Sequence, residues 1–346
     1  MRDTNQTIQK KDEITYSQSH VVLSDSALRN IIPPAPALLD KRIQPTLDFF
    51  SLEFMTQACV VILGTSSNAI PMSPLLYQKN ITIDNETQLT LTHLTKTCLL
   101  NISEPASYAS LFFMVPGIGH SLRINGTFKA INAHDGIFII EGVYFHCARA
   151  AARSELFSTY QTHHSQASIT EHTIIHQSPY ALLKTQNATG KTEISPRGDE
   201  AGFIKAINHN TLFMPERPGN KVAVSLRNIM NNPNIELLLM IPNTAYTLNI
   251  IGQAHVTTNP ALLELSEVNS KQPKIGIVIE ATSKQFQLDE KLTQSGLWDR
   301  ENFIDKKMLT AFPKALSSHM KGTGLMGKAT TLVVDAIVKH DMKNLY

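Results

Sequence analysis

The sequence contains one stretch twice, and this repeat constrains the fold more than any other feature. The apolar segment LFFMVP at Leu111–Pro116 is matched 126 residues later by LLLMIP at Leu237–Pro242. At the same spacing, a second apolar run ends at Gly126 in the first copy and at Gly252 in the second. Two apolar runs joined by a turn are typical of a β-hairpin. A hairpin present twice predicts two copies of one β-rich unit.

Weaker matches extend the two copies in both directions and set their limits. Upstream, Ser73-Pro74 answers Ser195-Pro196, and downstream Phe145, Ser154 and Leu156 recur 141 residues later as Phe286, Ser295 and Leu297. Short strands at close spacing with helices at the ends favour a small barrel, an α+β and mainly β fold. We therefore predict an N-terminal arm (1–36), repeat 1 (37–160), a linker (161–171), repeat 2 (172–310) and a C-terminal helical tail (311–346).

Composition limits the classes of protein to which the chain can belong. With 346 residues, 42% of them hydrophobic, it supplies a core for each of two domains. The net charge of +2 gives no basic surface typical of nucleic-acid or membrane binding, so we expect a small-molecule partner. Cys59, Cys98 and Cys147 are too few and too widely spaced for a disulfide framework, and no signal-peptide pattern opens the chain. These features predict a cytoplasmic protein.

Ordered motifs in the two repeats indicate a family. Repeat 2 carries SPRGD at Ser195–Asp199, MPERPGN at Met214–Asn220 and SLRN at Ser225–Asn228. Repeat 1 carries FHCARA at Phe145–Ala150, followed by Arg153-Ser154. In this order the motifs resemble those of the pyridoxamine 5'-phosphate oxidase-like FMN-binding split-barrel proteins, in the subgroup with SPRGD and RPGN signatures. The resemblance implies two tandem split β-barrels that form an intramolecular pseudo-dimer.

Each repeat retains the motifs that the other has lost. Repeat 1 has Leu75 where SPRGD requires arginine and lacks RPGN, but it keeps LRING and the histidine segment. Repeat 2 has Asn249, Ile251 and Gln287 at the positions of Arg123, Asn125 and His146. In the family that these motifs resemble, two identical barrels pair and each flavin touches both subunits. The complementary losses therefore predict one complete site, and one FMN, per chain.

The residue types in these motifs suit a flavin phosphate. Planar guanidinium groups match phosphate oxygens, and a positive or donor group suits the pyrimidine edge of the ring, where charge develops on reduction. The predicted cofactor-binding residues are Arg197, Gly198, Asp199, Arg217, Asn220, Ser225 and Arg227 in repeat 2, with Arg123, Asn125, His146, Arg149, Arg153 and Ser154 in repeat 1. No catalytic residue is assigned.

Purely structural roles compete with these assignments. Arg197 and Asp199 also suit a turn ion pair, His146 suits a core histidine, and Arg149 with Arg153 suits the solvated face of a helix. The histidines His163, His164, His172 and His176 resemble a metal cluster, but no carboxylate or cysteine joins them, so no metal site is predicted.

The resemblance implies an FMN-dependent oxidoreductase that acts on a small molecule, with an electron donor such as NAD(P)H. The alternatives are a non-catalytic flavin carrier or sensor and a haem-binding split barrel. The pseudo-dimer predicts either a monomer or a homodimer of the whole chain.

Overall fold

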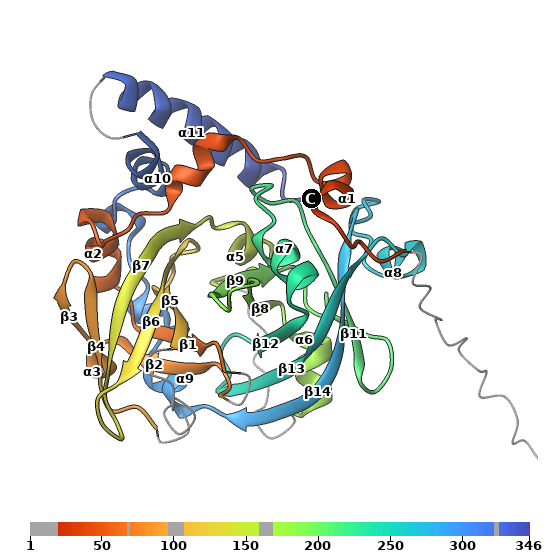
Figure 1. The fold of residues 1–346 in the computed structure, drawn as a ribbon, viewed down its shortest axis with the longest axis horizontal. Helices are drawn as coiled ribbons and strands as arrows, with labels where there is room; N and C mark the ends of the chain where they lie inside the picture. The colour runs from red at the N-terminus through yellow and green to blue at the C-terminus, as the bar shows by residue number, and fades with distance from the viewer. Residues whose placement is uncertain (1–19, 68–69, 96–106, 159–168, 322–324) are drawn as a thin grey trace, which may run out of the picture.

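The protein contains two antiparallel seven-stranded sheets, each curled into a half-barrel (Figure 1). The computed structural model describes residues 20–67, 70–95, 107–158, 169–321 and 325–346. Barrel 1 consists of β1 (Val60–Thr65), β2 (Ser73–Leu76), β3 (Ile81–Asn85), β4 (Gln88–Leu91), β5 (Ser107–Met114), β6 (Ser121–Ala130) and β7 (Gly136–His146). Barrel 2 consists of β8 (Tyr180–Gln186), β9 (Thr192–Gly198), β10 (Lys205–Ala206), β11 (Thr211–Pro215), β12 (Asn234–Met240), β13 (Tyr246–Thr257) and β14 (Gly276–Leu288).

The two sheets have the same strand order. Barrel 1 runs β2-β1-β5-β6-β7-β4-β3, and barrel 2 runs β9-β8-β12-β13-β14-β11-β10 in the same sense. The register agrees as well, because Leu111 pairs with Ile124 just as Leu237 pairs with Ile250. The predicted fold, a mainly β α+β chain with two split-barrel repeats, is confirmed.

A glycine at a β-bulge ends the shared hairpin motif in each barrel. The register of β6 against β7 shifts at Gly126, and that of β13 against β14 shifts at Gly252. A Cβ atom on Gly126 would lie 1.9 Å from the carbonyl oxygen of Ile139, and one on Gly252 would lie 2.1 Å from that of Glu280. The bulge brings the neighbouring strand so close that only glycine fits.

Short helices precede and follow each barrel. Just before Pro45 the chain is extended, since Gln44 forms a β-bridge to Val143. The α2 helix then begins behind an Asp48 capping box. The helices are α1 (Asp25–Ile31), η2 (Ala37–Arg42), α2 (Phe49–Thr56), α3 (Tyr77–Asn80), α5 (Arg149–Arg153), α6 (Glu171–Gln177), α7 (Val224–Asn231), α8 (Pro260–Glu264), α9 (Glu290–Gln294), η4 (Arg300–Asn302), η5 (Lys306–Met308), α10 (Phe312–Lys321) and α11 (Leu325–Lys343).

An apolar seam joins the two barrels. Strand β1 is buried on both faces: Val61 and Leu63 point into the core of barrel 1, whereas Val60 and Ile62 point into the seam. Strand β8 of barrel 2 is buried along its whole length in the same way. The seam consists of Val60, Ile62, Met72, Phe112, Met114, Ala151 and Leu156 from barrel 1 and Tyr180, Leu182, Ile194, Leu238, Met240, Leu292, Leu297 and Trp298 from barrel 2.

The N-terminal arm docks on barrel 2. Val22 donates a main-chain hydrogen bond to the carbonyl of Val256, and Leu28 of α1 is fully buried in the core of that barrel. Arg29 donates to the carbonyls of Lys221 and Val222. Within the described part of the arm, residues 20–36, the chain therefore supports the loop that carries the RPGN motif.

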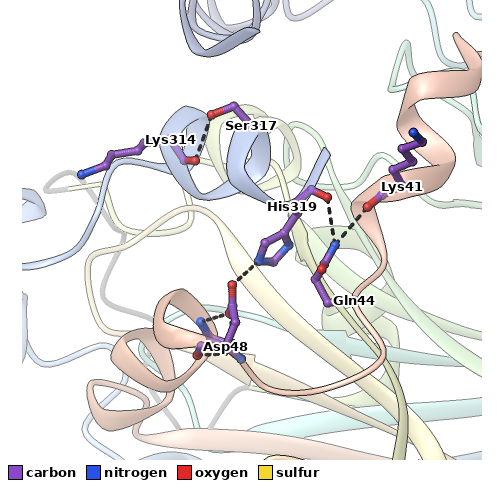
Figure 2. Close-up of polar contacts among 7 residues, drawn as sticks. Lys41, Gln44, Asp48, Lys314, Ser317 and His319 are labelled. Carbon is purple, nitrogen blue, oxygen red and sulfur yellow. Dashed lines mark hydrogen bonds and ion pairs between the residues drawn. The ribbon is translucent and has the colours of Figure 1, made fainter. Parts of the chain in front are cut away.

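The helical tail starts on barrel 1. Figure 2 shows His319 of α10 with its Nε2 2.8 Å from Oδ2 of Asp48, while Gln44 donates to the carbonyls of His319 and Lys41. Burial alone would raise the pKa of Asp48, but hydrogen bonds from His319 and Ser51 outweigh burial and lower that pKa. From this anchor α11 runs along the upper edge of the molecule toward the end of the chain (Figure 1).

Two of the three cysteines, Cys59 and Cys147, are free thiols, and Cys98 lies outside the described residues. Among the described helices, none has the length and apolar composition needed to cross a membrane. In the same residues, no group of three or more histidine, cysteine or carboxylate side chains is arranged to hold a metal. His163 and His164 of the histidine-rich stretch lie outside the described residues.

The bulge glycines predict a sharp difference between two glycine substitutions. Gly252→Ala should destabilise the protein by about 1–3 kcal/mol, because the added methyl group meets the Glu280 carbonyl and the strand must shift. Gly219→Ala is the control, since its nearest neighbour would be 3.9 Å away. The free energy of unfolding of Gly219→Ala should stay within about 0.5 kcal/mol of that of the parent protein. Thermal unfolding of both variants measures the difference, and equal midpoints would contradict the assigned close contact.

Candidate cofactor site

The seam brings the SPRGD strand of barrel 2 against the late motifs of barrel 1. In Figure 1, β9, the edge strand of the barrel 2 sheet, lies next to α5 near the centre of the view. A Cβ atom on Gly198 would lie 2.1 Å from the carbonyl oxygen of Ala150 in α5. Gly198 therefore lets this helix pack directly on the strand, a structural role that the sequence did not reveal. The predicted half-sites are in contact.

Arg123 connects the two barrels at this point. Its side chain is fully buried, and Nη1 donates to the carbonyl of Ile194 at 2.7 Å and to Oγ of Ser195 at 3.1 Å. Nη2 lies 3.1 Å from Oε2 of Glu193, and the guanidinium lies 4.1 Å from the ring centre of Tyr144. Burial lowers the pKa of Arg123 to about 10, partly offset by Glu193, so the group stays charged at neutral pH.

His146 lies beside this cation in an aromatic setting. Its ring centre is 5.7 Å from that of Phe112 and 5.0 Å from that of Tyr144. The Nε2 atom is buried, and no described residue forms a hydrogen bond with it. Burial, reinforced by the charges of Arg123, Arg42 and Arg197, lowers the pKa of His146 well below its usual value. The imidazole is therefore neutral at pH 7.

Asn125 lies two residues along β6 from Arg123 and is half-buried. Its Oδ1 accepts a hydrogen bond from Oγ of Ser110 on the neighbouring strand, at 2.9 Å. Its amide group is thereby fixed next to the Arg123 position.

Three further arginines and one carboxylate are connected through residues Asn344–Tyr346, and we call this group the arginine pocket. Arg149 and Arg153 come from α5 of barrel 1, and Arg217 and Asp199 come from barrel 2. Arg217 pairs with Asp199 through Nε and donates to the carbonyl of Ser266 through Nη2. All three arginines and Asp199 are largely buried, with side chains or residues less than 10% exposed.

Residues Asn344–Tyr346 of the tail complete the arginine pocket. Arg149 Nη2 donates to the carbonyl of Asn344 at 3.0 Å, and Arg153 Nε donates to that of Leu345 at 2.7 Å. The phenol of Tyr346 donates to Oδ1 of Asp199 at 2.6 Å, and its ring lies beneath the guanidinium groups of Arg217 and Arg153. These contacts span about half of the chain in sequence.

The arginine pocket has the chemistry of an anion site. Arg153 is bonded to two neutral acceptors, the carbonyls of Leu345 and Pro218. Burial, and next the charge of Arg149, lower the pKa of Arg153 to about 10, while Asp199 acts in the opposite direction. A phosphate oxygen is a stronger acceptor for a guanidinium than a carbonyl is. The residues present therefore fit a phosphate group such as that of FMN.

Arg197 links the Arg123–His146 region to the arginine pocket. Its Nε lies 3.2 Å from Oε2 of Glu216, and its charge acts on both Arg123 and His146. Glu216 in turn acts on Arg153. The alternative pairing of Arg197 with Asp199 in a turn is not what the structure shows, because Asp199 pairs with Arg217.

The remaining predicted residues lie at different distances from the arginine pocket. Ser154 is buried, and its Oγ donates to the carbonyl of Ala151. Asn220 accepts a hydrogen bond from the amide of Val222 within the RPGN loop, and Ser225 is buried in the first turn of α7. Arg227 is half-exposed and lies 3.1 Å from Asp25 of the arm. The structure thus brings most of the predicted set together and turns Arg227 toward the arm. The part that each residue plays in FMN binding stays a prediction.

Several residues of the site were missed by the sequence analysis. Tyr144 and Glu193 belong to no motif quoted above, although each lies within two residues of one, and Glu216 lies inside the MPERPGN motif but was not assigned to the site. Arg42, whose guanidinium lies 5.3 Å from the ring centre of Tyr144, comes from the segment before barrel 1. The tail residues carry no signal at all, because only the path of α11 places them here.

A cavity of about 720 Å³ adjoins the arginine pocket. This volume lies within the usual range for small-molecule and cofactor sites. Polar and apolar residues from both barrels and the tail line it: Ala152, Arg153, Ser154, Glu155, Ser158, Gln177, Pro179, Glu200, Ala201, Ile241, Pro242, Leu345 and Tyr346.

The pseudo-symmetric position across the seam is filled by protein. Asn249, which takes the place of Arg123, donates to the carbonyl of Met72 at 3.2 Å. Gly64 and Ser110 are opposite each other on neighbouring strands of barrel 1, and Lys184 and Glu236 occupy the equivalent positions in barrel 2. Lys184 and Glu236 form a 2.6 Å ion pair, and their side chains are only 1% exposed. The divergence of the two repeats has therefore placed two large charged side chains where the other half is small.

Comparisons with solved structures concern the fold. One similar structure is Group A Streptococcus HupZ, with 19% identity and a TM-score of 0.29, where the match covers 35% of this chain and 94% of that one. Another is general stress protein 26 of Bacillus anthracis, with 17% identity and a TM-score of 0.27, where the match covers 33% of this chain and 88% of that one. A third is a Clostridium acetobutylicum protein related to general stress protein 26, of the pyridoxinephosphate oxidase family. It has 12% identity and a TM-score of 0.24, and the match covers 32% of this chain and 80% of that one. Each match covers about a third of the chain. No protein-family profile and no curated protein sequence matches the chain.

The buried ion pair predicts a strong asymmetry between single and double substitution. Lys184→Met should destabilise the protein by about 3–5 kcal/mol, because it leaves the buried Glu236 carboxylate without its cation. Adding Glu236→Gln should recover part of that loss, since the amide oxygen still accepts from the Met72 amide. The control is Lys191→Met at the exposed pair with Glu141, expected to cost no more than about 1 kcal/mol. Denaturant unfolding gives all three values, and a double variant less stable than the single one would contradict the assignment.

Proposed function

We propose that the protein binds one FMN per chain at the seam between its two barrels and uses it as an oxidoreductase acting on a small molecule. The observation that carries the proposal is the arginine pocket, in which buried guanidinium groups from both barrels converge beside a cavity. The charge of Arg149 acts on Arg153, and Asp199 pairs with Arg217, so an anion would be stabilised beside Arg149 and Arg153.

The phosphate end of FMN would lie at Arg149 and Arg153. Both are buried and donate to neutral main-chain carbonyls, which a dianionic phosphate can replace with stronger, charge-assisted bonds. Arg217, held by Asp199, adds a third positive charge from the other barrel.

The ring end would use the apolar part of the cavity. Pro179, Ile241 and Pro242 supply apolar surface, and Ala152 and Ala201 leave room beside them. When bound, FMN supplies an acceptor for a hydride or single electrons, and the protein supplies its orientation and electrostatic setting. Arg123, Asn125 and His146 lie on the strands that lead into α5, and their placement beside the pyrimidine edge remains our prediction.

A second candidate is a flavin carrier or sensor without turnover, which the loss of one pseudo-symmetric site favours. A haem-binding barrel is the third, and the buried Nε2 of neutral His146 is the atom that would favour it. We further propose a cytoplasmic protein that takes electrons from a donor such as NAD(P)H and is a monomer or a homodimer of the whole chain.

Titration with FMN, followed by absorption and flavin quenching, tests the proposal. We expect one FMN per chain, and Arg153→Gln and Arg217→Gln should each weaken binding about tenfold or more although they lie in different barrels. Arg300→Gln, an exposed arginine of η4, is the control for the lost charge.

The outcomes separate the candidates. Two FMN per chain would contradict the single site, and protein that rejects added FMN would end the flavin proposal. A Soret band on addition of haem would favour the haem-binding alternative. Flavin reduction by NAD(P)H followed by reoxidation with an acceptor supports the oxidoreductase, whereas bound FMN without such a cycle supports the carrier.

A further inference from the structure

We propose that residues Asn344–Tyr346 are an internal competitor for the arginine pocket, so that the tail and the phosphate of a ligand bind Arg149 and Arg153 alternately. The identity of the ligand rests on the function proposed above, whereas the competition rests on the contacts of the tail alone. We call these three residues the strap.

The strap uses the hydrogen-bond donors that an anion would need. The carbonyls of Asn344 and Leu345 accept from Arg149 Nη2 and Arg153 Nε, at 3.0 and 2.7 Å. Because an N–H group directs its hydrogen at one strong acceptor, a phosphate oxygen that takes these donors must displace the carbonyls. The strap and a phosphate therefore compete for these two N–H groups.

Tyr346 fixes the strap from the opposite barrel. Its phenol donates to Asp199, and its ring contacts the guanidinium groups of Arg153 and Arg217. Burial, and next the hydrogen bond to Asp199, raise the pKa of the phenol, so it remains a donor at neutral pH. Lys271 donates to the main-chain oxygen of Tyr346 at 3.2 Å. The strap thus crosses the seam, touching both halves of the predicted site.

The construction of the tail allows the strap to leave without unfolding a barrel. The three residues follow the end of α11 and belong to no helix or strand. The tail has its own anchor far from the arginine pocket, at the His319–Asp48 pair and the Gln44 contact (Figure 2). Release of the strap would therefore expose the cavity, which Leu345 and Tyr346 line, while α10 stays docked.

Neutral carbonyls make the strap a displaceable occupant. Hydrogen bonds from a guanidinium to a phosphate are shorter and stronger than those to a carbonyl. A dianionic ligand is therefore favoured at Arg149 and Arg153 when present, and the strap shields the buried arginines when it is absent. The apparent affinity for the ligand is reduced by the fraction of molecules with the strap in place.

The test compares the full chain with a variant lacking residues 344–346. We expect the deletion to tighten FMN binding about tenfold or more in a quenching titration, and Tyr346→Phe, which loses only the bond to Asp199, to tighten it by a smaller factor. In the full chain, saturating FMN should increase amide hydrogen exchange over residues 340–346. Lys339→Gln, at an exposed pair on α11, is the control and should change neither quantity.

Two results of the FMN titration would overturn the competition. Equal FMN affinity for the full and shortened chains would overturn it and leave FMN binding intact, and weaker binding by the shortened chain would make the strap a wall of the site. If neither chain binds FMN, the flavin proposal fails by itself. Binding of inorganic pyrophosphate by the full and shortened chains then tests the competition. Tighter pyrophosphate binding by the shortened chain supports the strap, whereas equal binding, or none by either chain, refutes it.

Discussion

The structure depends on burial of a second face of the central strands. Strands β1 and β5 of barrel 1 and β8 and β12 of barrel 2 each turn one set of side chains into their own core and the other set into the seam. An isolated barrel would leave that second set, including Phe112 and Leu238, in water. The two halves therefore stabilise each other, and any site at their junction is held on both sides by strands with two buried faces.

The seam also concentrates charge where the dielectric is low. Arg123 and Lys184 are both fully buried at the seam, but they have different partners. Arg123 contacts Glu193 and a main-chain carbonyl, whereas Lys184 pairs with Glu236. The first arrangement continues into the arginine pocket and its cavity, and the second fills its own space with a closed ion pair. Duplication supplied two equivalent positions, and divergence of a few side chains made one a candidate binding site and the other a structural contact.

Much of this was predictable from residue patterns. The hairpin repeat predicted two copies of one β-rich unit, since identical patterns at fixed spacing adopt identical local pairings, and the structure adds that Gly126 and Gly252 lie at β-bulges. The motifs also predicted that β9 and α5 would meet. The packing role of Gly198 was less visible, because it depends on Ala150, a neighbour that is distant in sequence.

By itself, the sequence determined the duplication, the mainly β fold and the division of motifs between the repeats, because alternation, turns and ordered motifs are local or strictly periodic. Only the tertiary structure decided which arginines share a carboxylate, that Arg227 faces the arm, and that Asn344–Tyr346 reach Arg149 and Arg153. The contacts of Arg227 and of the tail join segments about 200 residues apart, and the choice of partner among several equivalent cations follows from the packing of the seam and the path of α11. Contacts of that kind leave no periodic trace in a chain, so they appear only when the folded molecule places the segments together.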